Sequence, residues 1–232
     1  MTVQRFYKSA KADEHGVMLD ARTLRTPGGV VFRAPTQALA QAVCEEWAAQ
    51  GEHILPATMP LTQLAFAALD GGEAARIERI AYVLKFAETD LCCHRAESLP
   101  ELVARQAAAW DPLVAWGAET LRARLAVVTG VVAAPASADA LGALRQRAEG
   151  LDDFRLTALA QAAGLSGSAL IAFALVEGRI AAAAAFAAAA LDDLWSLERW
   201  GEDEEARGRL DRLRGELDAV ARFVRALSGA ST

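Results

Sequence analysis

Paired carboxylates are the side chains in this sequence whose type and spacing come closest to a chemical site. Asp192 and Asp193 follow a long alanine run, and a second acidic cluster occupies 202–205. Adjacent acids usually mark the first turn of a helix, and the 202–205 cluster fits the start of the last predicted helix. We expect one continuous helix over 181–200, which places Asp192 and Asp193 in its middle, where aspartate is a poor helix former. This conflict predicts a buried or interfacial role for the pair.

An enzyme would have to bring distant acids together, and Asp90, Asp111 and Asp193 are the candidates. Such a site would show a concave pocket that joins the three carboxyls and raises their pKa values. The sequence has no phosphate-binding GxxxxGK[ST] loop, no strand-linked GxGxxG, no HExxH and no GxSxG. An enzyme of unknown type therefore stays an alternative, and no catalytic or cofactor-binding residue is predicted.

The cysteines predict neither a metal site nor a disulfide. Cys92 and Cys93 are adjacent and precede His94, and the third cysteine is remote. If these three residues lie on a helix, their side chains point about 100° apart and cannot converge on one ion. We interpret them as half-buried helix residues in a reducing compartment, with no metal and no cofactor.

The tryptophans divide into core residues and possible partner contacts. Large aromatic residues fill cores, but tryptophan is also enriched where proteins bind one another. Trp110 is predicted to be structural. Trp195 and Trp200 flank a charged segment, so we expect at least one of them to be partly exposed.

Composition limits the class of protein. The 232 residues carry a formal net charge of −6, 53% are hydrophobic and 54 are alanine. A chain of this size buries roughly 70% of its surface without needing disulfides or metal, and its acidic charge argues against a nucleic-acid partner. The most apolar stretch, Ala169 to Leu191, is broken by a Glu-Gly-Arg triplet, so no membrane span is predicted.

The first 60 residues predict a small α/β domain with short antiparallel strands. The β-favouring runs are Arg5–Lys8, Val17–Leu19 and Val30–Ala34. Thr36 can cap a helix that ends near Gly51. Within that helix Trp47 shares a face with Leu39 and Val43, so we predict a structural role where the helix meets the next domain.

Residues 61–232 predict an all-helical domain, which makes the chain an α+β protein of two domains. Helices are expected at 138–149, 153–163, 168–177, 181–200 and 203–228, with Gly164 and Gly201 at C-terminal ends. Asp111 and Pro112 form a helix-start signal, with a carboxylate cap followed by proline at the first helical position. The stretch 125–132 is β-branched and predicts a strand or an extended connector.

Several longer strings follow one another along the chain: RFYK (5–8), LDARTLRTP (19–27), EEWAAQGEHILPATMPLTQLA (45–65), TDLCCHRA (89–96), QAAAWDPLVAW (106–116), GSALIAFAL (167–175) and LDDLWSLERWGEDEEA (191–206). Taken together and in this order, they resemble the family of chaperones that attends the alpha subunit during assembly of the F1 sector of mitochondrial and alphaproteobacterial ATP synthase. The resemblance implies a small α/β domain, a larger helical domain and a non-enzymatic role. It also implies that the protein keeps unassembled alpha subunit soluble until beta pairs with it, in the bacterial cytoplasm or in the mitochondria of eukaryotic relatives.

The resemblance also directs attention to the region that begins at residue 191. The family favours a glutamate where Asp193 stands, and Ser196 replaces its glutamine; further upstream Ala21 replaces a glycine. We therefore expect Asp193, Asp192, Trp195 and Trp200 to bind the partner, whereas Trp47, Trp110, Asp111 and Pro112 are structural. A helical scaffold for some other partner remains the second alternative.

Overall fold

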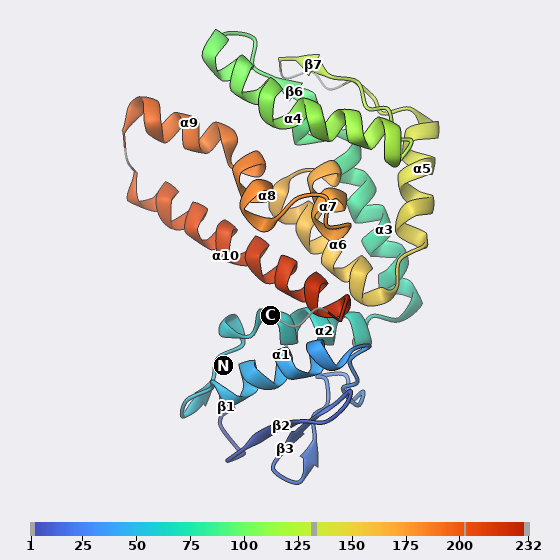
Figure 1. Ribbon diagram of the computed structural model, residues 1–232, viewed down its shortest axis with the longest axis vertical. Coiled ribbons are helices and arrows are strands. Elements are labelled where there is room, and N and C mark those ends of the chain that lie inside the picture. The colour runs from blue at the N-terminus through green and yellow to red at the C-terminus, as the bar shows by residue number, and fades with distance from the viewer. Residues whose placement is uncertain (1–2, 131–133, 202, 230–232) are drawn as a thin grey trace.

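The computed structural model describes residues 3–130, 134–201 and 203–229 and confirms the predicted α+β class. Short strands and one helix form a small N-terminal unit (Val3–Ile54), and α2 to α10 form a larger helical body (Figure 1). The run at 125–132, predicted as a strand or an extended connector, lies partly outside the described residues. The acidic residue Glu202 lies wholly outside them. The domain boundary near residue 60 stays a prediction.

The described residues of the N-terminal unit form two small antiparallel sheets. The first joins β1 (Val3–Gln4) to β5 (His53–Ile54). The second is the three-stranded order β2 (Ala10–Ala12), β3 (Val17–Leu19) and β4 (Arg22–Thr23). Of the three predicted strands only the one at 17–19 forms as expected. The run at 5–8 is not a strand, and the run at 30–34 provides a single bridge from Val31 to Arg25.

Helix α1 (Gln37–Ala48) starts where the sequence predicts. The Leu39 backbone N–H donates to the Thr36 hydroxyl at 3.2 Å, so Thr36 caps the helix. Leu39, Val43 and Trp47 are all buried on its inner face. The Trp47 ring lies 5.7 Å from the ring of Tyr7, so the indole packs on the N-terminal segment of its own unit.

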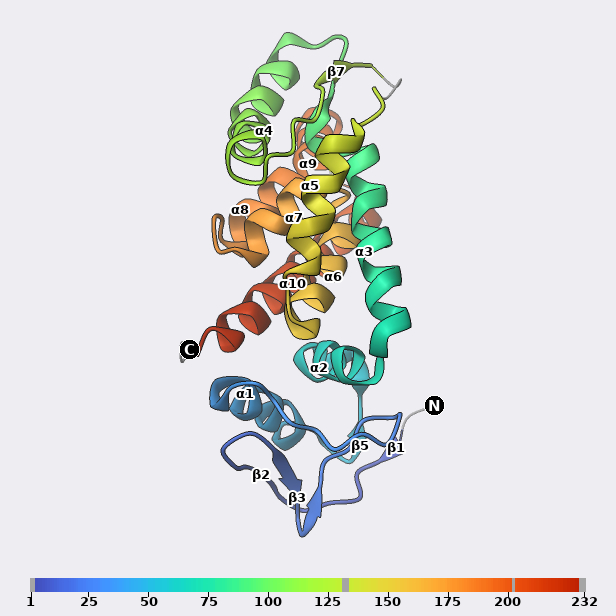
Figure 2. The ribbon, with the colours of Figure 1, turned by 90° about the vertical axis from the view of Figure 1, so that its right-hand side faces the viewer.

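Helix α6 lies at the centre of the helical body, where it packs against α2, α3, α7 and α10 (Figure 2). Each residue of α7 is buried. No helix among the described residues is long and apolar enough to cross a membrane. The helices of the body are α2 (Pro60–Asp70), α3 (Gly72–Glu88), α4 (Pro100–Thr120), α5 (Ala138–Glu149), α6 (Asp153–Ser166), α7 (Ala169–Val176), α8 (Ala182–Ala189), α9 (Leu191–Trp200) and α10 (Glu204–Leu227).

The helix start predicted at Asp111 and Pro112 was wrong. Asp111 and Pro112 do not start a helix but lie inside α4, which begins at Pro100. The helix continues through the proline because Trp110 and Leu113, on either side, are both buried against the core. The stretch 125–132, predicted as a strand or an extended connector, contains the two-residue strand β7 (Val128–Thr129), which pairs in parallel with β6 (His94–Arg95).

Two glycines allow helices to approach closely. A Cβ at Gly117 of α4 would lie 2.5 Å from Leu170 Cδ2 of α7, and a Cβ at Gly164 would lie 2.7 Å from the Tyr82 hydroxyl of α3. Gly164 was predicted to end a helix, yet α6 continues to Ser166 and ends at Gly167, whose φ of 67° suits glycine. Gly164 is therefore a packing residue.

Candidate partner-binding site

The helical hairpin α9–α10 carries the predicted partner-binding residues, and its start differs from the expectation. The helix predicted over 181–200 is interrupted at Ala190, so this stretch forms two helices, α8 and α9. Asp192 and Asp193 lie in the first turn of α9, where no side chain caps the helix. Carboxylates there are favourable because they face the positive end of the helix dipole. The mid-helix conflict that first singled out the pair is absent.

Asp192 is tied to the helical body. Its Oδ1 accepts a hydrogen bond of 2.8 Å from Gln106 Nε2 of α4. Gln106 is buried, and its Oε1 accepts the Ala96 backbone N–H at 2.9 Å. This contact links α9 to α4, so Asp192 has a structural partner of its own.

Asp193 is exposed and only loosely paired. Its Oδ1 lies 3.3 Å from Arg209 Nη2 of α10, and the two side chains are 51% and 57% exposed. An ion pair with this exposure contributes about 0–1 kcal/mol. The carboxylate can therefore exchange its partner without a large loss of stability.

The two tryptophans of α9 occupy opposite environments. Trp195 is 5% exposed, whereas Trp200, at the far end of the helix, is 70% exposed. Their ring centroids are 5.1 Å apart in an edge-to-face arrangement. We therefore expect Trp195 to hold Trp200 in place and Trp200 to offer the contact surface.

Trp110 and Asp111 contribute to a buried network around Arg95. The Trp110 indole N–H donates to the Ala188 carbonyl at 2.9 Å, and the Arg95 guanidinium lies 5.1 Å from the Trp110 ring centroid. Arg95 also donates to Asp111 Oδ1 at 2.6 Å and to the Cys92 carbonyl. These contacts join α4 to α8 and to the 92–95 segment.

Asp90 is a buried helix cap, a role that the sequence analysis missed. It is 1% exposed and accepts hydrogen bonds from Ser168 Oγ at 2.6 Å and from the Leu170 and Cys92 N–H groups at 3.0 Å. Burial raises the pKa of this carboxyl, while the hydrogen bond from Ser168 opposes the rise. Ser168 also caps α7 through the Ile171 N–H, and serine before an apolar run is a signal the sequence does contain.

The enzyme alternative required Asp90, Asp111 and Asp193 to share a pocket. Asp90 is enclosed at the start of α7, Asp111 pairs with Arg95, and Asp193 pairs with Arg209 on the outer hairpin. No pocket found among the described residues is lined by all three. The three carboxyls are thus held by different partners in different parts of the molecule.

Glu46 is a second buried acid that the sequence analysis missed. Its carboxylate accepts the Leu61 N–H at 2.9 Å and both the N–H and the hydroxyl of Thr62 at 2.7 Å. It therefore caps α2, whose own cap residue Met59 provides no side-chain bond. The signal was available, because position 46 follows Val43 by three residues on the apolar face of α1.

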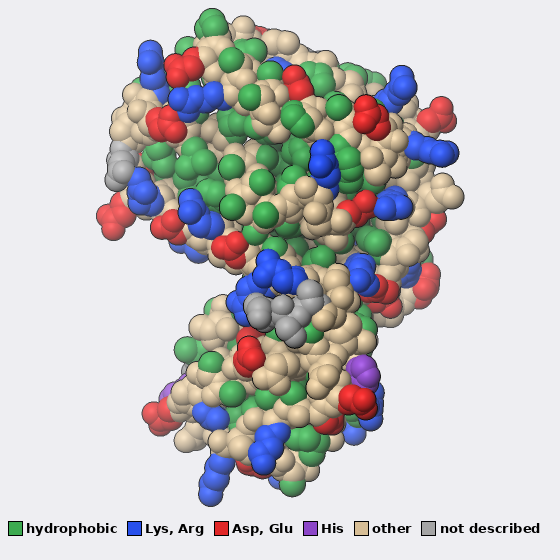
Figure 3. Space-filling view, viewed as in Figure 1, with side chains coloured by type: hydrophobic (Ala, Val, Ile, Leu, Met, Phe, Trp, Pro, Cys, Tyr) green, Lys and Arg blue, Asp and Glu red, His purple; other side chains and the backbone are tan. Residues whose placement is uncertain are grey.

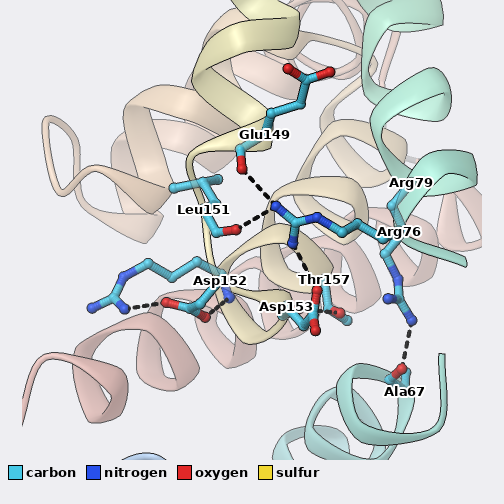
Figure 4. Close-up of polar contacts among 9 residues, drawn as sticks. Ala67, Arg76, Arg79, Glu149, Leu151, Asp152, Asp153 and Thr157 are labelled. Carbon is cyan, nitrogen blue, oxygen red and sulfur yellow. Dashed lines mark hydrogen bonds and ion pairs between the residues drawn. The ribbon is translucent and has the colours of Figure 1, made fainter. Parts of the chain in front are cut away.

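The acids at 152–153 also have structural roles. Arg76 of α3 pairs with Asp153 Oδ1 at 2.8 Å and donates to the Glu149 and Leu151 carbonyls at 2.6 and 2.9 Å (Figure 4). Asp152 accepts the Arg155 N–H and caps α6. Arg76 therefore fastens the turn between α5 and α6 to α3.

The cysteines are free and buried. Cys92 and Cys93 lie in a 3₁₀ turn rather than in an α-helix, and they are buried rather than half-buried. Burial raises the pKa of the Cys93 thiol to about 12, so it stays protonated and unreactive near neutral pH. Among the described residues, no group of three His, Cys, Asp or Glu side chains could hold a metal ion.

Known proteins share this architecture along almost the whole chain. Residues 4–118 match the family described as ATP12 chaperone protein. The crystal structure of Atp12 from Paracoccus denitrificans matches with a TM-score of 0.90 and 38% identity, covering 97% of this chain and 98% of that one. A point mutant of the same protein matches with a TM-score of 0.88 and 38% identity, over the same shares of both chains. The mitochondrial protein atp12 of Schizosaccharomyces pombe is 24% identical over 224 residues, or 88% of this chain and 75% of that protein.

The small strand-containing unit and the helical body with its projecting hairpin therefore define a chaperone fold. Identity of 38% over nearly the full length of both chains is enough to assign the family. The chain belongs to the ATP12 chaperone family.

Proposed function

We propose that this protein binds the unassembled alpha subunit of F1 ATP synthase and keeps it soluble until the beta subunit pairs with it. The observation that carries the proposal is membership of the ATP12 chaperone family, together with the ordered strings that resemble the alpha-subunit chaperone. The role is non-enzymatic and takes place in the bacterial cytoplasm. Mitochondria are the corresponding compartment for the yeast relative, whose name places it there.

The exposed end of α9 supports the proposal physically. A chaperone needs a surface that complements a client and binds weakly enough to be displaced by a larger final interface. Trp200 provides an exposed aromatic surface, and Asp193 provides a carboxylate whose ion pair is weak. We propose that these two residues contact the alpha subunit, with Trp195 and Asp192 holding them in position.

The test is co-expression of the cognate alpha subunit with and without this protein, followed by separation of soluble and aggregated alpha. We expect soluble alpha to depend on the protein and to fall by at least tenfold without it. Equal amounts of soluble alpha in the two cultures would refute the function. If the protein instead recovers a different subunit or an unrelated protein from the same cells, the helical-scaffold alternative gains support.

A further inference from the structure

A groove between α8, α9 and α10 has an apolar floor, in which Phe186 and Leu210 are buried while Leu194 and Leu197 stay partly exposed. It has a volume of about 190 Å³. Figure 3 shows hydrophobic side chains gathered in the hollow between α9 and α10. The apolar lining residues are Phe186, Leu194, Leu197 and Leu210, and the charged ones are Glu198, Arg207, Asp211 and Arg214.

Helix α9 is packed on too little of its surface for an ordinary core helix. Of its ten residues only Trp195 is buried, while Leu191, Leu194 and Leu197 touch the core and stay partly exposed. A helix this short is marginal on its own and gains most of its stability from packing an apolar face. The groove side of α9 therefore has room for a further packing partner.

The charges of the α10 wall restrict what that partner can be. Arg207, Asp211 and Arg214 line the wall at spacings of four and three residues, so their signs alternate over about 10 Å of helix. The Arg214 guanidinium lies 4.4 Å from the Phe186 ring centroid, over the apolar floor. On the opposite wall Glu198 is already paired with Arg105 at 2.6 Å. A helix that carries a base and an acid three residues apart beside an apolar stripe would complement Asp211 and Arg214.

We propose that this groove receives an amphipathic helix of the client, with one or two large apolar side chains on the floor and an acidic side chain on Arg214. A cavity of about 150 Å³ holds a benzene molecule, so the volume suits apolar anchor side chains rather than a whole helix. The proposal rests on the proposed function, because the client is the alpha subunit. It uses the helix-in-groove mode of recognition, in which anchors at helical spacing give both affinity and register.

The first experiment places a photo-crosslinking phenylalanine analogue at Leu197, in the groove, and at Ile77 of α3 as the matched control. Ile77 is 59% exposed and lies outside the groove lining. In cells that co-express alpha, we expect the Leu197 position to crosslink to alpha and the Ile77 position to crosslink at least fivefold less. Mass spectrometry should map the crosslink to an amphipathic segment of alpha. A crosslink to a second copy of this chain, or equal yields at both positions, would overturn the proposal.

The second experiment reverses one charge on the wall. Arg214→Glu should lower the amount of alpha retained by about tenfold, whereas Arg212→Glu, on the same helix but outside the groove lining, should leave it within twofold. Both residues are exposed, and Arg214→Glu removes only the contact with the Phe186 ring, so melting temperatures close to that of wild type are expected and serve as the folding control. If wild type retains alpha and Arg214→Glu retains the same amount, the groove does not bind the client and the groove proposal is refuted. The proposed function is unaffected by that result. If wild type itself retains no alpha, the proposed function fails and the groove proposal fails with it.

Discussion

Asp90 and Asp193 both lie at the start of a helix, yet the molecule surrounds them in opposite ways. The Asp90 side chain is buried beside the first turn of α7. It accepts hydrogen bonds from the Ser168 hydroxyl and from the backbone N–H groups of Leu170 and Cys92. Asp193 lies on the outer hairpin with one ion pair of 3.3 Å. A buried acid with several donors holds the fold together, whereas an exposed acid with one weak partner costs little to redirect. An aspartate thus stabilises the core of the helical body at position 90, whereas the aspartate at position 193 on the hairpin is available for binding.

The tryptophans repeat this contrast. Trp47 and Trp110 are buried in the two parts of the molecule, while Trp200 is mostly exposed beside the buried Trp195. If the contrast is correct, substitutions at the buried positions should change the free energy of unfolding. Substitutions at the exposed hairpin positions Asp193 and Trp200 should change client retention alone.

The largest expected effect is that of Trp47→Arg. The substitution removes a buried aromatic ring packed on Tyr7 and introduces a charge without a partner, so we expect a loss of at least about 4 kcal/mol. Urea unfolding followed by circular dichroism measures it. A variant with an unchanged unfolding midpoint but no client retention would place Trp47 in the binding surface instead.

Asp90→Ala should be nearly as damaging. It leaves the Leu170 N–H, the Cys92 N–H and the Ser168 hydroxyl buried without their acceptor, for an expected loss of about 3 kcal/mol. The matched control is Asp139→Ala, which removes an exposed carboxylate from the first turn of α5 and should cost less than about 1 kcal/mol. Equal losses in the two variants would contradict the assignment of Asp90 as the buried cap.

Glu46→Gln should cost about 1–2 kcal/mol near neutral pH, because an amide cannot accept every hydrogen bond that the carboxylate takes from Leu61 and Thr62. The carboxylate of the adjacent, exposed Glu45 accepts a hydrogen bond from Gln41 on the surface of the same helix, so Glu45→Gln is the control and should stay within about 0.5 kcal/mol. Thermal unfolding of the three proteins side by side measures the difference.

The same pair of variants tests a pH dependence. Burial raises the pKa of Glu46 above its ordinary value, so the folded state binds this proton more tightly than the unfolded state. This group's contribution to stability therefore falls as pH rises from the ordinary glutamate pKa through the raised one. That slope should disappear in Glu46→Gln and persist in Glu45→Gln, and an identical slope in both would refute the assignment.

The smallest expected effect on stability is that of Trp200→Ala. Its ring is mostly exposed, so the free energy of unfolding should change by less than about 0.5 kcal/mol. Retention of alpha should nonetheless fall by about tenfold if the ring is a contact residue. Co-expression measures retention, and a stable variant with full retention would remove Trp200 from the proposed surface.

The sequence predicted the regular parts of the fold well and the irregular parts poorly. Helix α5 formed over 138–149 as expected because Ser137 supplies a cap and the apolar spacing is regular. The break at Ala190 was missed because alanine favours helix on both sides, and only tertiary packing separates α8 from α9. The prediction at Pro112 failed because proline normally starts or breaks a helix, whereas α4 continues through this one. The burial of its neighbours stabilises the helix there.

The candidate site shows the same division. The sequence predicted that at least one of Trp195 and Trp200 would be partly exposed, because the two residues flank a charged segment. It did not predict which of the two that would be. The caps that Asp90 and Glu46 provide connect segments separated by 78 and 16 residues, and no local pattern specifies such partners. Asp193 was predicted to bind the partner because aspartate is unfavourable in the middle of a helix, but it lies in the first turn of α9. The prediction of partner binding now depends on its exposure and on the family resemblance.

The most direct test of the central claim compares wild-type protein with Asp193→Asn as alpha subunit is diluted from denaturant, with aggregation followed by light scattering. Asp193 has one weak ion pair, so the melting temperature of the variant should match wild type. We predict that wild type suppresses scattering at an equimolar ratio and that the equally stable variant suppresses it much less. Equal suppression by the two proteins would contradict the claim that the exposed hairpin holds the client.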